Sequence, residues 1–171
     1  MPKYVDRGSV VSLVAAPVKR QKIACTQASV LISGVIQLLG YETVLEIVVA
    51  QGSFPNELEI AELLKLNSGL FCLLLFIAGI CFLASCLFSD TRYSIGLGAG
   101  IPALMYVLQM LANAGEDAEK AKYFTFFTLF QPENLVAGKS SALMGVTILL
   151  ICGIALFAAG IFLFCKKDLY I

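Results

Sequence analysis

Apolar residues are concentrated in four long stretches of the chain, at residues 23–50, 67–88, 93–113 and 141–165. A helix of about 20 apolar residues crosses the hydrocarbon core of a bilayer, so each stretch is long enough to span it. The pattern therefore predicts an all-α membrane protein with four transmembrane helices, in a transmembrane domain over residues 23–171.

The composition supports this class. The chain of 171 residues is 59% hydrophobic and 14% charged, and its mean hydropathy is +0.88. These values exceed the apolar share of an ordinary soluble domain. The formal net charge is zero, so the charge balance implies no nucleic-acid partner.

The sequence offers little for catalysis or for a cofactor. It contains no histidine, and its six cysteines form no CxxC pair, so neither a zinc site nor a histidine-activated nucleophile is indicated. Gly138, Lys139 and Ser140 resemble the end of a phosphate-binding loop, but Glu133 stands where that motif needs its first glycine. We expect no cofactor and no enzymatic activity from this chain alone.

Basic residues outside the apolar stretches predict the orientation, because cytoplasmic loops are enriched in Lys and Arg. One side of the membrane would carry Lys3, Arg7, Lys19, Arg20, Lys22, Arg92, Lys166 and Lys167. The other side would carry Lys65, Lys120, Lys122 and Lys139. The side with more basic residues is expected to be cytoplasmic. Both termini would then be cytoplasmic, in a multi-pass protein of the plasma membrane.

The first 22 residues form a basic segment with a short helical pattern. Ser9 can cap a helix over residues 10–16, and Pro17 ends it because proline has no N–H. The surface of this helix is mostly valine and leucine, so we expect it to pack against a membrane or another protein. Physical chemistry alone leaves two options open: a helix on the membrane surface, or a helix that docks on a partner.

A family resemblance favours the docking helix. The first 20 residues resemble the signature of ABC-2 type transporter permeases. The matching positions are, in order, YVDRGS at residues 4–9, Leu13 and PVKR at residues 17–20. The resemblance continues through residues 94–102, 124–129 and 166–169, and so covers essentially all 171 residues. The chain departs from the family pattern at Tyr4 and Val5, where a second acidic residue is usual, and at Lys19, where a hydroxyl residue is common.

The resemblance implies a function and partners. It implies a permease subunit that couples ATP hydrolysis on a separate ATP-binding cassette ATPase to export, paired with a second permease subunit in the lipid bilayer. It also implies that this chain lacks the first two membrane helices of the family. The ATPase-coupling residues would be Asp6, Arg7, Gly8, Ser9, Pro17 and Arg20.

Two connecting segments would lie on the external side. Residues 51–66 predict a loop with a short helix that starts at Pro55 and Asn56. Residues 123–130 are strongly aromatic but too short to cross a membrane, and predict a re-entrant or interfacial segment. The resemblance implies short external helices at this place, whereas an aromatic belt at the membrane boundary is the alternative.

Glu42 and Glu46 are the least expected residues of the first apolar stretch. They are four positions apart and share one helix face. One interpretation is that they line a polar pathway for the substrate. The other is that the span ends near Tyr41, which leaves both carboxylates in headgroup water. Asn67, Ser68, Gln109 and Asn113 also lie near the ends of their stretches.

Glycines predict where helices pack. Gly96 and Gly100 form a GxxxG pair in the third stretch, and Gly153 and Gly160 recur at helical spacing in the fourth. Two other functional classes stay open: a self-contained four-helix channel or membrane-assembly factor, and an intramembrane enzyme. The second would have to use Cys81, Ser85, Thr147 and Cys152, which is a poor set for acid–base chemistry.

Overall fold

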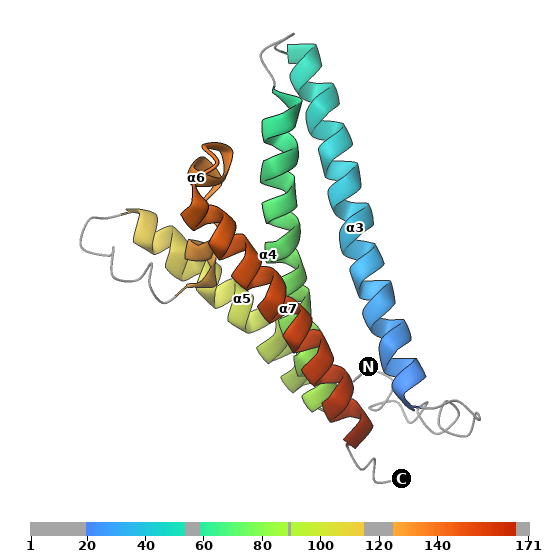
Figure 1. Ribbon diagram of the computed structural model, residues 1–171. Coiled ribbons are helices and arrows are strands. Elements are labelled where there is room, and N and C mark those ends of the chain that lie inside the picture. Colours follow the sequence, from blue (N-terminus) through green and yellow to red (C-terminus); the bar gives the residue numbers. More distant parts are fainter. Residues whose placement is uncertain (1–19, 54–58, 89, 115–124, 167–171) are drawn as a thin grey trace.

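The computed structural model describes residues 20–53, 59–88, 90–114 and 125–166, and these residues are helical apart from short connections. Figure 1 shows the arrangement of the helices. In chain order they are α3 (Arg20–Ser53), α4 (Ile60–Leu87), α5 (Thr91–Ala114), the 3-10 helix η2 (Phe126–Leu129), α6 (Pro132–Val136) and α7 (Ser140–Lys166).

The four predicted apolar stretches each form one long helix, and all four helices are long and apolar enough to cross a membrane. The predicted all-α class and the number of spans are therefore confirmed. The predicted coupling helix at residues 10–16 lies outside the described residues.

The connection between α3 and α4 is shorter than the sequence suggested. Residues 60–66, which we expected in an external loop, form the first turns of α4 instead. The reason is that Leu63 and Leu66 continue the apolar face that follows them, while Glu62 in the first turn suits the positive end of the helix.

Consecutive long helices run in opposite directions (Figure 1). The beginning of α3, the beginning of α5 and the end of α7 therefore lie at one end of the molecule. The short elements η2 and α6 connect α5 to α7 towards the other end. This placement brings the two short elements beside the first half of α4.

Helix α4 is the centre of the fold. It packs against α7 over the most extensive interface in the described chain, and it also contacts α5, α3 and α6. In its most apolar window 39% of the residues are buried, against 11% in the corresponding window of α3. Helix α3 is thus the outermost of the four long helices.

Glycines allow α4 and α7 to approach closely. A Cβ atom at Gly153 would lie 3.3 Å from the backbone of Phe76, and one at Gly79 would lie 3.1 Å from Leu156 Cβ. Gly160 faces the ring of Phe82. Close backbone approach at small residues is a common way for membrane helices to pack, because it maximises van der Waals contact.

Two glycines also hold the segment between α5 and α7. The side chain of Leu135 in α6 packs against Gly69, and the carbonyl oxygen of Leu129 in η2 packs against Gly145. Gly138, with a φ of 66°, ends α6: its N–H bonds the Leu135 carbonyl at 3.1 Å, and the next N–H bonds the Asn134 carbonyl at 3.0 Å. This Schellman turn redirects the chain into α7.

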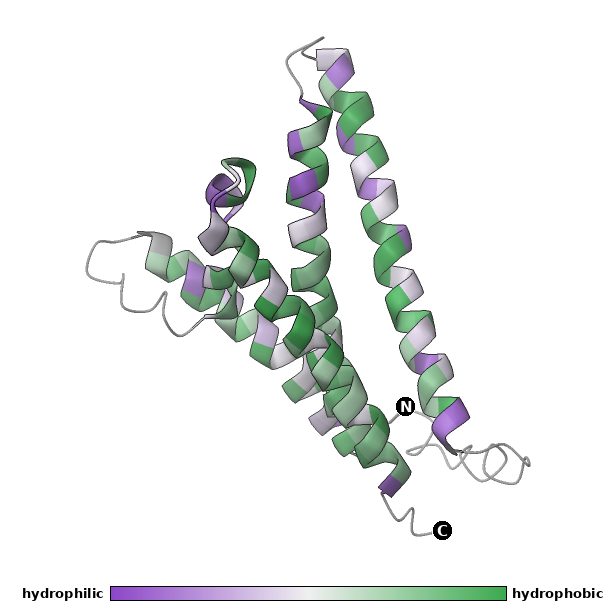
Figure 2. Cartoon of the chain, in the orientation of Figure 1, coloured by the Kyte–Doolittle hydropathy of each residue, from purple (hydrophilic) through white to green (hydrophobic). Residues whose placement is uncertain are grey.

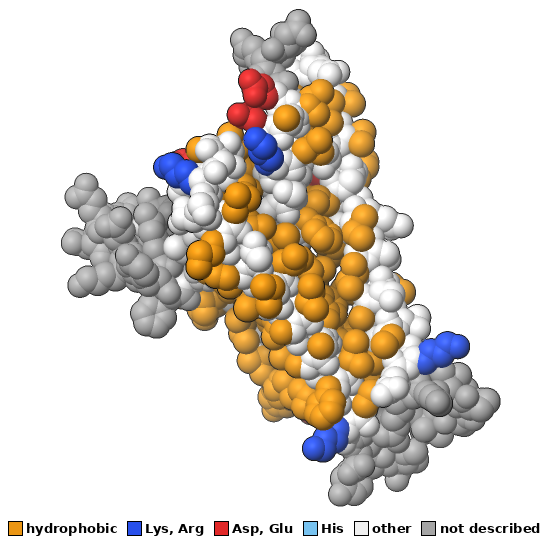
Figure 3. All heavy atoms as spheres, viewed as in Figure 1, with side chains coloured by type: hydrophobic (Ala, Val, Ile, Leu, Met, Phe, Trp, Pro, Cys, Tyr) orange, Lys and Arg blue, Asp and Glu red, His pale blue; other side chains and the backbone are white. Residues whose placement is uncertain are grey.

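Apolar side chains cover most of the visible surface between the ends of the helices (Figure 3), and hydrophilic positions gather towards those ends (Figure 2). Large residues such as Val48, Ile95 and Phe162 are at least 60% exposed. Such a surface is unfavourable in water and suits lipid. Together with the four long helices, it makes the chain a multi-pass membrane protein.

Substituting Gly145 tests the seating of η2. In Gly145→Ala the new methyl group would overlap the Leu129 carbonyl, and backbone cannot move aside cheaply, so we expect a loss of about 1–3 kcal/mol in unfolding free energy. Gly100→Ala is the matched control, because no described atom lies within 4 Å of a Cβ there. The measurement is the unfolding midpoint in detergent, followed by circular dichroism. Equal midpoints for the two variants would contradict the described seating.

Candidate functional site at the helix contacts

Most of the predicted coupling residues lie outside the described part of the chain. This applies to Asp6, Arg7, Gly8, Ser9 and Pro17. Arg20 is the first residue of α3, so the predicted coupling segment leads directly into that helix. The polar groups that the structure describes lie between the helices.

A polar contact joins α3 to α4. The Asn67 side-chain amide donates hydrogen bonds to Thr43 Oγ1 at 2.9 Å and to Glu46 Oε2 at 3.0 Å. Thr43 in turn donates to the Leu39 carbonyl at 2.7 Å. Asn67 is only 4% exposed, so its amide depends on these two partners for its hydrogen bonds. We call these three residues, Thr43, Glu46 and Asn67, the α3–α4 clamp.

The clamp separates the two glutamates that the sequence analysis grouped. Glu46 faces α4 and bonds Asn67, whereas Glu42 is half-exposed and forms no hydrogen bond within the described residues. Helix α3 continues through both without a break to Ser53. The shared helix face is present, but only Glu46 contacts another helix through its carboxylate.

A second polar cluster joins α5 to η2. Thr125 donates a short hydrogen bond to Gln109 Oε1, Thr128 lies 3.5 Å from the same oxygen, and the two threonine hydroxyls are 3.1 Å apart. Thr125 is 3% exposed. These bonds fix the position of the aromatic segment against α5, which no spacing in the sequence predicted.

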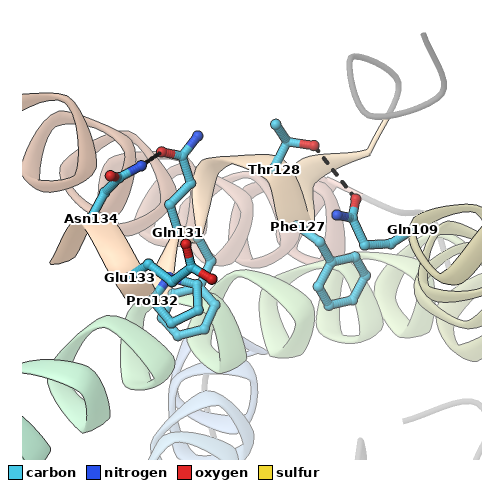
Figure 4. A pocket seen from close by; sticks show the side chains of 8 residues that line it. Gln109, Phe127, Thr128, Gln131, Pro132, Glu133 and Asn134 are labelled. Carbon is cyan, nitrogen blue, oxygen red and sulfur yellow. Dashed lines mark hydrogen bonds between the residues drawn. The ribbon is translucent and has the colours of Figure 1, made fainter. Parts of the chain in front are cut away.

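A cavity of about 370 Å³ lies beside this cluster (Figure 4). Gln131 and Asn134 border one side and are joined by a hydrogen bond of 2.6 Å, and Lys139 donates to Asn134 at 2.9 Å. Gln109, Phe127 and Thr128 border the other side (Figure 4). The remaining lining residues are Phe130, Pro132 and Glu133.

The cavity lining can bind water or a polar group, but it contains no catalytic pair. Its side-chain donors and acceptors are the amides of Gln109, Gln131 and Asn134, the Thr128 hydroxyl and the Glu133 carboxylate. Within the described residues no group of three or more Cys, Asp or Glu side chains is placed to hold a metal ion. The arrangement suits binding and helix positioning.

Helix α5 contains a proline whose effect is compensated by α4. Pro102 lies inside the helix and has no N–H for the carbonyl of Gly98, four residues earlier. The Cys81 thiol lies 3.2 Å from that carbonyl and donates to it. A Cβ at Gly98 would lie 3.4 Å from Cys81 Cα, so α5 approaches the backbone of α4 closely at this glycine.

The predicted packing glycines divide into two groups. Gly153 and Gly160 lie in the α4–α7 interface, whereas no described atom lies within 4 Å of a Cβ at Gly96 or Gly100. Within this chain the contact of α5 is made by Gly98, which lies between them. Gly69, Gly79 and Gly98 were not recognised from sequence, although a proline at position 102 does signal that the carbonyl at position 98 needs another donor.

Comparisons of the chain with models of protein families, with curated proteins and with solved structures find no match. The function is therefore argued from the residues and their arrangement.

The Cys81 thiol offers a sharp test of the α4–α5 contact. Cys81→Ala would leave the Gly98 carbonyl without a donor, which costs about 1–3 kcal/mol for a buried acceptor. Cys81→Ser keeps a donor and should recover most of that loss. Cys72→Ala controls for lost packing volume, since Cys72 is a buried cysteine of α4 without a hydrogen bond in the described chain. The comparison uses unfolding midpoints in detergent, and equal values for Cys81→Ala and Cys81→Ser would disprove the thiol's role.

The clamp can be tested by removing its buried amide. Asn67→Leu leaves Glu46 without its donor, so we expect a loss of about 1–3 kcal/mol and a looser attachment of α3. Spin labels at Gln51 and Lys65, both exposed, should give a broader distance distribution in this variant. Ser68→Ala is the control, because the Ser68 hydroxyl bonds only the backbone of its own helix, at Lys65. An unchanged distribution in Asn67→Leu would show that the clamp does not hold α3.

Proposed function

We propose that this chain is the membrane-spanning permease subunit of an ATP-binding cassette exporter, driven by a separate ATPase subunit. The observation that carries the proposal is the order of elements. A basic segment at residues 1–22 leads into three membrane-length helices, then a pair of short helices packed into the bundle, then a fourth long helix. This order agrees with what the resemblance to ABC-2 type permeases implies.

Coupling would run through α3. The ATPase would bind residues 6–20, with Asp6, Arg7, Gly8, Ser9, Pro17 and Arg20 as contacts, and its closure would displace the start of α3. That helix is the least buried of the four. It packs on α4 and α7 in its first half through Ala28, and on α4 nearer its end through the α3–α4 clamp. An unbroken helix of this length would move as a rigid rod and so carry motion from the start of α3 across the bilayer to the clamp.

We further propose that η2 and α6 form the external re-entrant or interfacial segment. Phe126, Phe127 and Phe130 pack against the apolar cluster around Cys72 and Leu149. This inward packing supports a re-entrant segment over an aromatic belt facing lipid. In this orientation both termini are cytoplasmic, in the plasma membrane, and the end of the molecule with Lys22, Arg92 and Lys166 faces the cytoplasm.

The chain itself would neither bind nor hydrolyse ATP, and nucleic acid is not among its proposed partners. Its partners would be the ATPase, a second permease subunit and the lipid bilayer. Glu42 and Glu46 lie on α3, the helix that would move, and the exposed side of Glu42 leaves it available to a polar substrate pathway.

A pull-down in detergent tests the coupling assignment. The native chain should bind the ATPase subunit from the same organism, and Arg20→Glu combined with Pro17→Leu should reduce binding by about tenfold or more, since reversing a contact charge and extending a docking helix both disrupt the interface. Lys65→Glu makes the same charge change at the other end of the molecule and should bind normally. A native chain that fails to bind the ATPase but conducts ions in liposomes would favour a self-contained channel instead.

A further inference from the structure

Helix α3 presents a continuous stripe to the outside of the bundle, and we define this outer stripe by the residues Val30, Gly34, Gln37, Tyr41, Val44 and Val48. All six are exposed in the described structure. At 3.6 residues per turn, Gln37 lies about 180° around the helix from Ala28, which is buried against α4 and α7. Gln37 therefore faces away from the rest of the chain, whereas Val30 and Gly34, at one edge of the stripe, also border a hollow between α3 and α4.

Gln37 is out of place on a lipid-facing surface. The Thr26 and Ser33 hydroxyls nearby bond the backbone of their own helix, at 2.8 and 3.0 Å. The Gln37 amide forms no hydrogen bond within the described residues. In hydrocarbon an unsatisfied amide is costly, so a position like this is expected to have a partner.

The length of α3 places Gln37 in the hydrocarbon core whatever the register of the helix. The helix has 34 residues and is about 51 Å long, and Gln37 lies about 25 Å from either end. A hydrocarbon core about 30 Å thick that fits within this length must include that point. A shift of the helix along its axis therefore does not move the Gln37 backbone out of the hydrocarbon core.

The stripe has the spacing of a helix–helix seam. Val30, Gln37 and Val44 are seven residues apart, and Gly34, Tyr41 and Val48 follow each of them by four. This is an a/d heptad pattern, with Val30, Gln37 and Val44 at position d and Gly34, Tyr41 and Val48 at position a. Such a pattern favours left-handed pairing of helices.

We infer that the outer stripe of α3 is the surface through which two copies of this chain pair in the membrane. Two copies inserted in the same orientation bring their Gln37 residues to the same depth. A glutamine amide both donates and accepts hydrogen bonds, so two of them can pair reciprocally across a two-fold axis along the membrane normal. The inference rests on the proposed function only in that it assigns a surface to the subunit pairing which that function requires.

Cysteine cross-linking in liposomes tests the pairing on this chain alone, with no ATPase present. The exposed cysteines are first removed as Cys25→Ser and Cys152→Ser. Val44→Cys lies on the stripe and Leu45→Cys lies beside it, at the same depth and also exposed, at 62% and 46% in the native side chains. Under mild oxidation Val44→Cys should form a disulfide dimer several-fold faster than Leu45→Cys, and equal rates, or no dimer from either, would overturn the inference.

The role of the amide is tested by adding Gln37→Leu or Gln37→Asn to Val44→Cys. Gln37→Leu should slow cross-linking and weaken association by about three- to tenfold, as expected for loss of an interhelical hydrogen bond in a membrane. Gln37→Asn should retain most of both. Association that is unaffected by Gln37→Leu would overturn the pairing through the amide. Dimers at the stripe in a chain that does not bind the ATPase would support the pairing surface and count against the permease function. ATPase binding by a chain that forms no dimers at the stripe would support the permease function and overturn the pairing surface.

Discussion

The structure depends on the close contact of α4 and α7. In a bilayer there is no water to drive apolar surfaces together, so long helices associate only if their backbones approach closely enough for extensive van der Waals contact. Gly79, Gly153 and Gly160 make that approach available here. The remaining elements attach to this pair. Helices α5 and α3 pack on α4, and the short elements η2 and α6 lie between the first half of α4 and α7.

Polar groups are the second constraint, because each one buried between the helices needs a partner. The carbonyl that Pro102 leaves free is bonded by the Cys81 thiol, the Asn67 amide is bonded by Thr43 and Glu46, and the Gln109 oxygen accepts from η2. Each bond joins two different elements. Polar residues in this chain therefore fix which helices meet and at what depth, while apolar contact supplies most of the packing.

The packing and polar contacts are unevenly distributed among the helices. A helix that moves relative to the others has to be held less tightly than they are. Helix α4 packs against every other long helix, whereas α3 is the least buried of the four and leaves its outer stripe exposed. A permease whose coupling segment precedes α3 would use such a helix to carry motion from the ATPase. The glutamine in the middle of that exposed stripe is the basis on which we propose that the same helix also pairs with another subunit.

The number, type and approximate bounds of the long helices follow from sequence, because twenty or so consecutive apolar residues have few alternatives to a membrane helix. The packing role of Gly153 could also be proposed from sequence, because small residues recur at helical spacing in its stretch. The partners of Asn67, Gln109 and Cys81 could not, since each bond joins helices far apart in sequence and depends on how they rotate and slide against each other. The same holds for Gly96 and Gly100: the sequence identifies a face able to pack, but only the tertiary structure decides that α5 turns Gly98 towards α4 and leaves that face outward.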